Sequence, residues 1–386
     1  MMQEEFDILC LAETREAIEV NIDRKPTDIA LDKRVVSARL VAEQVKYLQR
    51  ARKKLPTLYE ARCIIPPRAY EQSSSEETAR AKSEICGAKL LELTCGLGVD
   101  SLWLSRSFER VVTLERDEIL AQVVRENFAR LGVENIEVVN MAAEDFVAQT
   151  TEHFDWIYVD PDRRTDGGER VIKLEECSPN IIEMLPRLRK ISERLAVKCS
   201  PIFDVDEAFR LFENAKVEVV SLHDECKEVV IYSPMAEEQI AVTAVGRAEF
   251  SAQRSEVENL PTSIAFDVES ATKYRWLILP DVALLKGRVA MHFVGREADI
   301  WSNNGFGFAV EQPRNCYGRI FEIEQILEYQ PKTLRKILGG KKVEIIMRDF
   351  PQSLNKVMAQ LKTKSGDEAR VALTLIGGKL ITIILK

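Results

Sequence analysis

Apolar residues in the first 70 positions recur every three to four residues, the spacing of an amphipathic helix. The clearest set comprises Leu40, Val41, Val45 and Leu48. Several Arg and Lys residues follow this set, and cations favour the C-terminal end of a helix. Pro66 and Pro67 then interrupt the pattern, because proline cannot continue a helix. The pattern predicts a helical N-terminal region over residues 1–70.

A short polar stretch, EQSSSEETARAKSEICG, comes next. Ser74 is followed three residues later by Glu77, which matches a capping box at the start of a helix. Gly87 is a typical residue at a helix end. The stretch therefore predicts a helix that begins near Ser75 and stops at Gly87.

From residue 88 onward, apolar strand-like runs alternate with amphipathic helical segments. The runs, in chain order, end in LLELTCG, VVTLERD, NIEVVN, IYVDP and LAVKCSP. Two more runs, VEVVSLHD and KEVVIYS, lie too close together for a helix between them and predict an antiparallel pair at the sheet edge. Such alternation indicates an α/β fold with a mostly parallel sheet. We expect a Rossmann-like sheet of seven strands in a domain over residues 71–270.

The pattern changes again past residue 270. Short strand-like pieces appear there as YRWLILPD, RVAMHFVG and GFGFAVE, and SLNKVMAQLK has helical spacing. This mixture predicts a small α+β domain over residues 271–386.

Composition favours a folded protein of a reducing compartment. Hydrophobic residues make up 46% of the chain and charged residues 30%, which are ordinary values. The eight cysteines contain no C-x-x-C pair, which indicates reduced thiols and no metal site. The acidic start does not resemble a secretory signal, and no apolar run approaches the ~20 residues of a membrane span. We expect a cytoplasmic protein with no membrane partner.

A glycine turn follows the first strand of the alternating region. Gly96 and Gly98 stand between this strand and a helix, where nucleotides often bind. A dinucleotide site needs a third glycine at the position of Ser101. S-adenosylmethionine has no pyrophosphate and needs only a close approach of the backbone. A tight turn without any ligand is the alternative.

Acidic residues follow the first three strands in an order that suits a sulfonium nucleoside. Glu92, on the first strand, can approach the methionine ammonium group. Glu115 ends the second strand and can accept hydrogen bonds from both ribose hydroxyls. Asp145 follows the third strand and can meet the adenine amino group. Each residue alone is simply explained as a solvated strand end or turn, but together they favour a methyl-donor site.

These stretches together resemble the class I S-adenosylmethionine-dependent methyltransferases. More narrowly, the chain is similar to bacterial members that carry a ferredoxin-like and THUMP-like domain at the C-terminus. The stretches that carry the resemblance include EQSSSEETARAK, LLELTCGLGVDSLWLS, NFARLG, YVDPDRR, KCSPIFDV, ECKEVV, LPDVALLKG and VEIIMRDFP. The resemblance implies S-adenosylmethionine as the cofactor. The cofactor-binding residues that it implies are Ser74, Glu92, Cys95, Gly96, Gly98, Glu115, Arg116, Glu144, Asp145 and Asp160.

The resemblance also places a catalytic loop at YVDPDRR. Its implied catalytic residues are Asp160, Pro161, Asp162 and Arg163. Amino-methylating relatives often have Asp or Asn, two prolines and an aromatic residue here, and the acid accepts hydrogen bonds from the target amine. In this chain Asp162 replaces the second proline and Arg163 the aromatic residue. We expect Asp160 to orient the amine and the arginines to hold a phosphate or stack on a base; alternatively, the arginines pair with nearby acids.

The C-terminal region is basic although the chain has a net charge of −8. Residues 314–386 contain 14 Lys and Arg against 7 Asp and Glu. The candidates for phosphate contacts are Lys332, Arg335, Lys336, Lys341, Lys342 and Arg348. THUMP-like domains resemble RNA readers, so the resemblance implies tRNA or rRNA as the substrate; a solvated charged face is the alternative.

We therefore expect a methyltransferase that acts on an exocyclic amine of an RNA base. Two other functions are compatible with the sequence. One is a methyltransferase for a protein or small molecule, with the C-terminal domain used for docking. The other is a protein that binds S-adenosylmethionine and RNA without catalysis.

Overall fold

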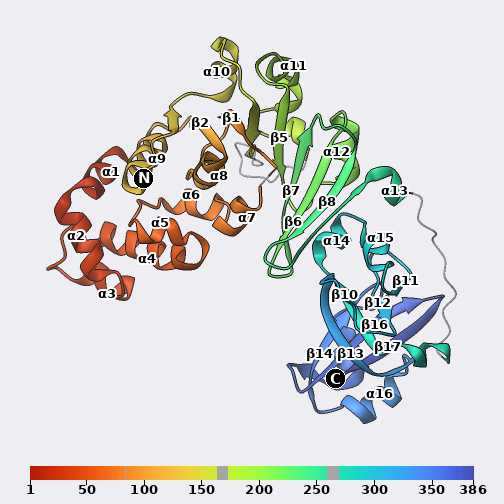
Figure 1. Cartoon of the computed structure of the whole chain (residues 1–386). Helices are drawn as coiled ribbons and strands as arrows, with labels where there is room; N and C mark the ends of the chain where they lie inside the picture. Colours follow the sequence, from red (N-terminus) through yellow and green to blue (C-terminus); the bar gives the residue numbers. More distant parts are fainter. Residues whose placement is uncertain (83, 163–172, 259–268) are drawn as a thin grey trace. The chain divides into compact units, whose positions relative to one another are not determined.

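The computed structural model describes residues 1–82, 84–162, 173–258 and 269–386. Within these residues the chain divides into two compact units (Figure 1). The first unit comprises Met1–Val217 and Glu228–Ala236, and the second comprises Glu218–Lys227 and Glu237–Lys386.

Helices alone make up the regular structure of residues 1–82. Their bounds are α1 (Gln3–Cys10), α2 (Ala12–Asn21), α3 (Pro26–Leu31), α4 (Ala38–Lys54), α5 (Pro56–Glu60), α6 (Pro67–Gln72) and α7 (Glu76–Arg80). Helix α4 is the longest, and its apolar residues Val41, Val45 and Leu48 are fully buried. They belong to the same hydrophobic core as Val124 and Phe128, which lie on a helix after the second strand. The N-terminal helices therefore pack against the alternating part of the chain.

Strands and helices alternate through residues 87–233 (Figure 1). Their bounds are β1 (Gly87–Glu92), α8 (Val99–Leu104), β2 (Phe108–Leu114), α9 (Glu118–Leu131), β3 (Ile136–Val139), α10 (Ala143–Gln149), β4 (Trp156–Val159), α11 (Ile181–Ile191), β5 (Arg194–Cys199), α12 (Val205–Leu211), β6 (Lys216–Leu222) and β7 (Glu225–Ser233). Strands β1 to β5 pair in parallel, and β7 runs antiparallel to β5. All four residues of β4 are buried, as expected for a parallel strand covered on both faces.

The strand order of this sheet is β3-β2-β1-β4-β5-β7-β6-β8-β9. The chain moves outward from β1 to β3 and then crosses to β4 on the other side of β1. Ligands of open α/β sheets bind beyond the carboxyl ends of the strands where the order reverses, which here is between β1 and β4. The predicted α/β fold class is confirmed, but β6 and β7 are not the sheet edge, because β8 (Gln239–Ala244) and β9 (Ala248–Gln253) follow them in the order.

Two glycines let the chain turn sharply from β1 toward α8. Gly96 and Gly98 have φ angles of 57° and 77°, a region that disfavours residues with a Cβ atom. A Cβ atom on Gly98 would lie 2.8 Å from the ring of Phe128 on α9. Gly98 therefore permits both the turn and its close packing on α9.

Helix α7 is shorter than the helix that the polar stretch predicts. It ends at Arg80 rather than at Gly87, which instead begins β1. Ser75 caps it by accepting a backbone N–H of the first turn, so Ser74 is not the cap. After the helix the chain turns inward and buries Lys82. In the interior this lysine forms ion pairs with Asp100 and Glu228.

The second unit contains an eight-stranded sheet in the order β11-β12-β10-β13-β17-β16-β14-β15. The bounds of its strands are β10 (Trp276–Pro280), β11 (Asp299–Ile300), β12 (Gly307–Ala309), β13 (Gly318–Glu328), β14 (Lys342–Met347), β15 (Lys364–Ser365), β16 (Ala369–Ile376) and β17 (Lys379–Leu385). The bounds of its helices are α13 (Arg254–Glu258), α14 (Val282–Lys286), α15 (Ala290–Val294), α16 (Pro331–Leu338) and α17 (Leu354–Leu361). Leu334, Leu338 and Val357 anchor α16 and α17 in one hydrophobic core.

One strand-like piece of this region proved to be helical. The segment RVAMHFVG contains α15, in which Ala290, Phe293 and Val294 are buried. These residues are spaced three and four apart, so they lie on one face of a helix. The strand prediction was wrong because a short apolar run does not by itself distinguish the two structures.

The two compact units do not end at residues 70 and 270. The amide group of Asn127 on α9 forms hydrogen bonds of 2.7 and 2.9 Å with the backbone N–H and C=O of Ile64. This contact and the shared core place the N-terminal helices in the first unit. The three-part division of the sequence therefore stays a prediction.

Candidate functional site

A cavity of about 760 Å³ lies beyond the carboxyl ends of β1, β2, β4 and β5 in the first unit. Several predicted cofactor-binding and catalytic residues line it, namely Ser74, Cys95, Gly96, Glu115, Arg116, Glu144, Asp160, Pro161 and Asp162. Glu92, Gly98 and Asp145 are not among its lining residues. The sheet order thus brings together residues from segments that are far apart in the sequence.

Glu115 follows β2 and holds the glycine turn through its carboxylate. Its Oε2 accepts the backbone N–H of Gly96 at 2.9 Å, and its Oε1 accepts that of Asp117 at 2.9 Å. Burial raises the pKa of Glu115 above its usual value. A carboxylate oxygen has a second lone pair, so both oxygens can accept a further hydrogen bond from a ligand. Arg116, next in sequence, donates to the hydroxyl of Ser178 at 3.3 Å.

Glu92 lies beneath the turn, only 1% exposed. Its Oε2 accepts the hydroxyl of Thr113 at 2.7 Å and also the hydroxyl of Ser101. Burial is the main cause that raises the pKa of Glu92 to about 8. A protonated carboxyl that is absent from the cavity wall supports the floor of the site and does not offer a charge to the predicted ammonium group.

Replacing Glu92 by Gln should remove a pH dependence of folding stability. In the unfolded chain a glutamate loses its proton at about pH 4.3, as it does in a short peptide. Between about pH 4.3 and pH 8 the unfolded state has released a proton that the folded state still holds. The contribution of Glu92 to the stability of the folded state is therefore complete below about pH 4.3 and falls as the pH rises to about 8. We expect the melting temperature of the wild type to fall relative to Glu92→Gln between about pH 5 and pH 8. Parallel melting curves of the two proteins across this range would contradict the assignment.

The other residues predicted to bind S-adenosylmethionine take different positions. Glu144 and Asp145 are both exposed on α10, and of the two only Glu144 lines the cavity. Ala143 and Val147 are the buried residues of α10, and this orientation turns Asp145 toward solvent. Cys95 lines the cavity, and burial raises the pKa of its thiol far above the usual value.

Asp160 follows β4 directly and is tied to the strand ends on either side. Its backbone N–H donates to Thr94 Oγ1 at 2.8 Å, and its Oδ2 accepts Lys198 Nζ at 2.5 Å. Its Oδ1 has no hydrogen-bond partner among the residues that the structure describes. Lys198 Nζ also donates to Ser74 Oγ at 2.8 Å, and Ser74 donates to Asp100 at 2.7 Å.

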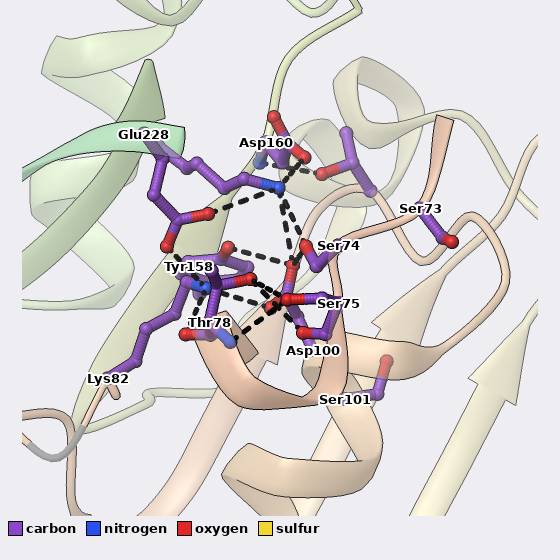
Figure 2. Close-up of polar contacts among 12 residues, drawn as sticks. Ser73, Ser74, Ser75, Thr78, Lys82, Asp100, Ser101, Tyr158, Asp160 and Glu228 are labelled. Atoms are coloured by element: carbon purple, nitrogen blue, oxygen red, sulfur yellow. Dashed lines mark hydrogen bonds and ion pairs between the residues drawn. The ribbon is translucent and has the colours of Figure 1, made fainter. Parts of the chain in front are cut away.

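A buried cluster of charged residues supports the ion pair between Asp160 and Lys198 (Figure 2). Lys82 Nζ lies 3.0 Å from Asp100 Oδ1 and 2.7 Å from Glu228 Oε1. The same two carboxyl groups lie 3.6 and 3.8 Å from Lys198 Nζ. With Asp160, three carboxyl groups therefore surround two ammonium groups. The hydroxyl of Tyr158 on β4 donates to Asp100 at 3.1 Å and completes the cluster.

The cluster keeps its lysines charged. Burial alone lowers the pKa of Lys198, but the carboxylates of Asp160, Asp100 and Glu228 raise it above its usual value. The pKa of Lys82 is raised in the same way, against burial, by Asp100 and Glu228. Burial raises the pKa of Glu228, whereas the two lysines overcome burial and lower that of Asp100.

The rest of the catalytic loop is described in part. Pro161 and Asp162 line the cavity. The backbone N–H of Asp162 donates to the carbonyl of Ser178 at 2.7 Å, and the reverse bond measures 3.0 Å. Arg163 lies outside the described residues.

Sequence reasoning missed Lys198, Lys82, Asp100 and Glu228. Charged residues are rarely buried unless they are paired. Lys198 stands within the apolar run LAVKC and Glu228 within CKEVVIY, so each is a charge in a strand that should be buried. A charged residue in an otherwise apolar strand was the signal that the sequence offered, but it does not identify the residues that pair with that charge.

The predicted RNA-binding residues belong to the second unit. Lys332, Lys336, Lys341 and Lys342 are exposed. Arg335 is exposed but donates to the carbonyl of Gln360 at 3.0 and 2.7 Å. Arg348 is half-buried, and burial lowers its pKa. Strand β15 adds Lys364, which pairs with Lys342 across parallel strands, and exposed Lys362 precedes it.

Across the described ranges, no three His, Cys, Asp or Glu side chains are gathered as a metal ion would require. Each helix in the same part of the chain is too short or too polar to cross a membrane.

Comparison with known proteins gives matches to both parts of the chain. Residues 318–386 match the family described as THUMP domain-like, and residues 78–176 match the family described as conserved hypothetical protein 95. The chain is 22% identical over 333 residues to an uncharacterized S-adenosylmethionine-dependent methyltransferase of Mycobacterium tuberculosis strain CDC 1551, covering 83% of this chain and 87% of the relative. It is also 29% identical over 137 residues to a tRNA/tmRNA (uracil-C(5))-methyltransferase of Pectobacterium atrosepticum, covering 30% of this chain and 37% of the relative.

A solved structure shares the fold of the whole chain. It is the crystal structure of a candidate methyltransferase from Porphyromonas gingivalis W83, which is 24% identical in sequence. The TM-score is 0.82, and the match covers 100% of this chain and 99% of that chain. The sheet order, the glycine turn with its acidic residues and these similarities together fit a class I S-adenosylmethionine-dependent methyltransferase with a THUMP domain-like segment at its C-terminal end.

Proposed function

We propose that the protein transfers the methyl group of S-adenosylmethionine to an exocyclic amine of an RNA base in tRNA or rRNA. The observation that carries this proposal is the position of Asp160. Its carboxylate lines the cavity, one oxygen is held by Lys198 at 2.5 Å, and the other has no hydrogen-bond partner among the described residues. An acceptor oxygen held in this way can accept an N–H of a target amine and orient its lone pair.

The cavity wall fits a nucleoside methyl donor. Glu115 offers two carboxylate oxygens with spare lone pairs, which suit the hydroxyls of a ribose. Backbone at Gly96 approaches the cavity without a side chain, and Ser74 and Glu144 add polar groups to its wall. S-adenosylmethionine supplies an electrophilic methyl group on a sulfonium ion when it is bound. We propose that these four residues and Arg116 hold it.

Asp160 then acts mainly by positioning. As the amine nitrogen bonds to the methyl carbon, the bond from that carbon to sulfur breaks, and the sulfonium leaves as a neutral thioether. The nitrogen loses a proton after attack, so a strong base is not needed. Fixing the amine in line with the breaking bond is the main contribution of such a site.

Two features support RNA as the substrate. The lysines Lys341, Lys342, Lys362 and Lys364 gather at one end of the second-unit sheet, where parallel pairing joins Lys342 to Lys364. Positive groups of this kind contact phosphates without reading sequence. The Pectobacterium relative is named for activity on tRNA and tmRNA, and the C-terminal segment is THUMP domain-like.

Methylation of uracil carbon is a second candidate function, favoured by the name of that relative. Carbon methylation uses a nucleophile, such as a thiolate, that adds to the ring first. Cys95 lines the cavity, but burial raises its thiol pKa and disfavours the thiolate. Cys199 ends β5, directly before the lining residues Ser200 and Pro201, but it is 3% exposed and is not itself among the residues that line the cavity.

The test is methyl transfer from labelled S-adenosylmethionine to total RNA from cells that lack this gene, with total protein as the second acceptor. We expect label in RNA, and mass spectrometry of the nucleosides should find it on an amine nitrogen. Changing Lys341 and Lys342 to Glu should raise KM for RNA without changing donor affinity. Label in protein alone would overturn the proposal, and 5-methyluridine would favour the second candidate.

A further inference from the structure

The wall of the cavity next to Asp160 is rich in proline and contains a large apolar side chain. Three prolines line it, namely Pro161, Pro179 and Pro201. Ile202 lines it as well, and 61% of this large apolar residue is exposed. Such residues present flat or rounded apolar surfaces on which a planar ring can pack. This part of the wall therefore differs from the part near Glu115, which carries the carboxylate.

Ser200 is a polar residue of this wall, as are Asp162 and Ser178. Ser200 is 5% exposed and lines the cavity, yet its hydroxyl has no hydrogen-bond partner among the described residues. Buried hydroxyls are normally paired, and leaving one unpaired is unfavourable. Nearby polar groups such as Ser74 and Lys198 are already engaged with each other at 2.8 Å. Because Ser200 is a residue of the cavity wall, a ligand in the cavity is a candidate partner for its buried hydroxyl.

We propose that Ser200, Ile202 and the three prolines form the subsite for the acceptor base, with Ser200 donating a hydrogen bond to the ring while Asp160 accepts one from the amine. This inference rests on the proposed function and names the substrate more closely. The base must carry an amine beside a hydrogen-bond acceptor. Adenine and cytosine have this pair on one edge, whereas uracil has a carbonyl oxygen in place of the amine.

The apolar wall can also take the place of the aromatic residue that the loop lacks. Relatives that methylate amines often stack an aromatic residue of the loop on the base, and this chain has no aromatic residue in DPDRR. Ile202 and the prolines supply apolar contact without a ring of their own. RNA bases that are read by proteins are typically unstacked and packed against side chains in this way.

The test is Ser200→Ala, measured as methyl transfer to total RNA from cells that lack this gene. We expect kcat/KM for RNA to fall about 5- to 10-fold, mainly through KM, because one hydrogen bond to the base is lost. S-adenosylmethionine affinity, measured by calorimetry, should stay within about twofold of the wild type. The melting temperature should stay equal or rise, since the substitution removes an unsatisfied buried hydroxyl.

Ser105→Ala is the matched control. Ser105 is 6% exposed, and its hydroxyl donates to the carbonyl of Leu102 at 2.9 Å, away from the cavity. This variant should melt at a lower temperature and keep the kcat/KM of the wild type. The two serine variants should therefore show opposite effects on stability and activity, which a purely structural role of Ser200 would not produce.

The other possible results separate a failure of the base subsite from a failure of the proposed function. Transfer to an RNA amine with unchanged kcat/KM in Ser200→Ala would overturn the subsite and leave the proposed function standing. Transfer to uracil carbon would overturn both the amine chemistry and the donor–acceptor pair proposed here. A wild type that binds S-adenosylmethionine but leaves RNA unmethylated would overturn the proposed function, and the base subsite with it.

Discussion

Replacing Asp160 by Ala is expected to lower kcat for methyl transfer by about 10²-fold while S-adenosylmethionine affinity changes little. The carboxylate is the acceptor proposed to orient the amine, and its loss leaves the lone pair of the nitrogen free to point elsewhere. The fold should survive, because two carboxyl groups, on Asp100 and Glu228, remain to pair with the two lysines. Calorimetry with S-adenosylmethionine and steady-state methylation of RNA separate binding from turnover.

Asp155→Ala provides the control for this prediction. Asp155 precedes the same strand at its other end, where Oδ2 accepts the backbone N–H groups of Ala88 and Lys89, each at 2.7 Å. Its replacement should reduce stability and spare turnover. If Asp160→Ala kept the wild-type kcat, the proposed role of this carboxylate would be wrong. If it lost donor binding instead, Asp160 would be a cofactor ligand.

Replacing Lys198 by Met is expected to destabilise the first unit by about 3–5 kcal/mol. The change removes one of two ammonium groups that are surrounded by three buried or half-buried carboxyl groups. A carboxylate left buried without its partner pays the cost of desolvation without an opposite charge nearby. Urea denaturation followed by circular dichroism, analysed for the transition of the first unit, measures the loss.

Two further variants test the electrostatic cause. Lys89→Met removes a half-exposed lysine whose ion pair with Glu152 measures 2.9 Å, and a surface pair of this kind contributes about 0–1 kcal/mol. Lys198→Met combined with Glu228→Gln should recover part of the lost stability, because it removes a carboxylate together with the missing ammonium group. Equal losses in the single and double variants would show that packing, and not charge, explains the effect.

The sequence predicted the elements of the first unit well where local patterns were strong. The apolar runs that lead into Gly96 and Asp160 became β1 and β4, and the run before Glu115 became β2. Positive φ at Gly96 and Gly98 agrees with the turn that those glycines indicated. Local patterns were weaker guides to boundaries, as α7 shows. Its capping serine is Ser75, because the hydroxyl of Ser74 is used in a contact with a distant strand.

Side-chain direction decides which of the predicted site residues line the cavity. Glu92 and Asp145 both stand at the positions that the resemblance implied, but neither lines the cavity. Glu92 points into a buried hydroxyl pair, and Asp145 lies on the solvent side of α10. The direction of each side chain depends on which face of its strand or helix packs against the core. A sequence motif does not specify that direction.

Local residue patterns were enough to predict the α/β class, the glycine turn and the acids at the strand ends, since each depends on residues close together in the chain. The surroundings of Asp160 depend instead on long-range packing. Ser74 and Lys198 are 124 positions apart, and they meet because β5 lies beside β4 in the sheet. Long-range packing also left the hydroxyl of Ser200 unpaired at the cavity wall. Contacts of this kind depend on sheet order and packing, which no local pattern of residues specifies.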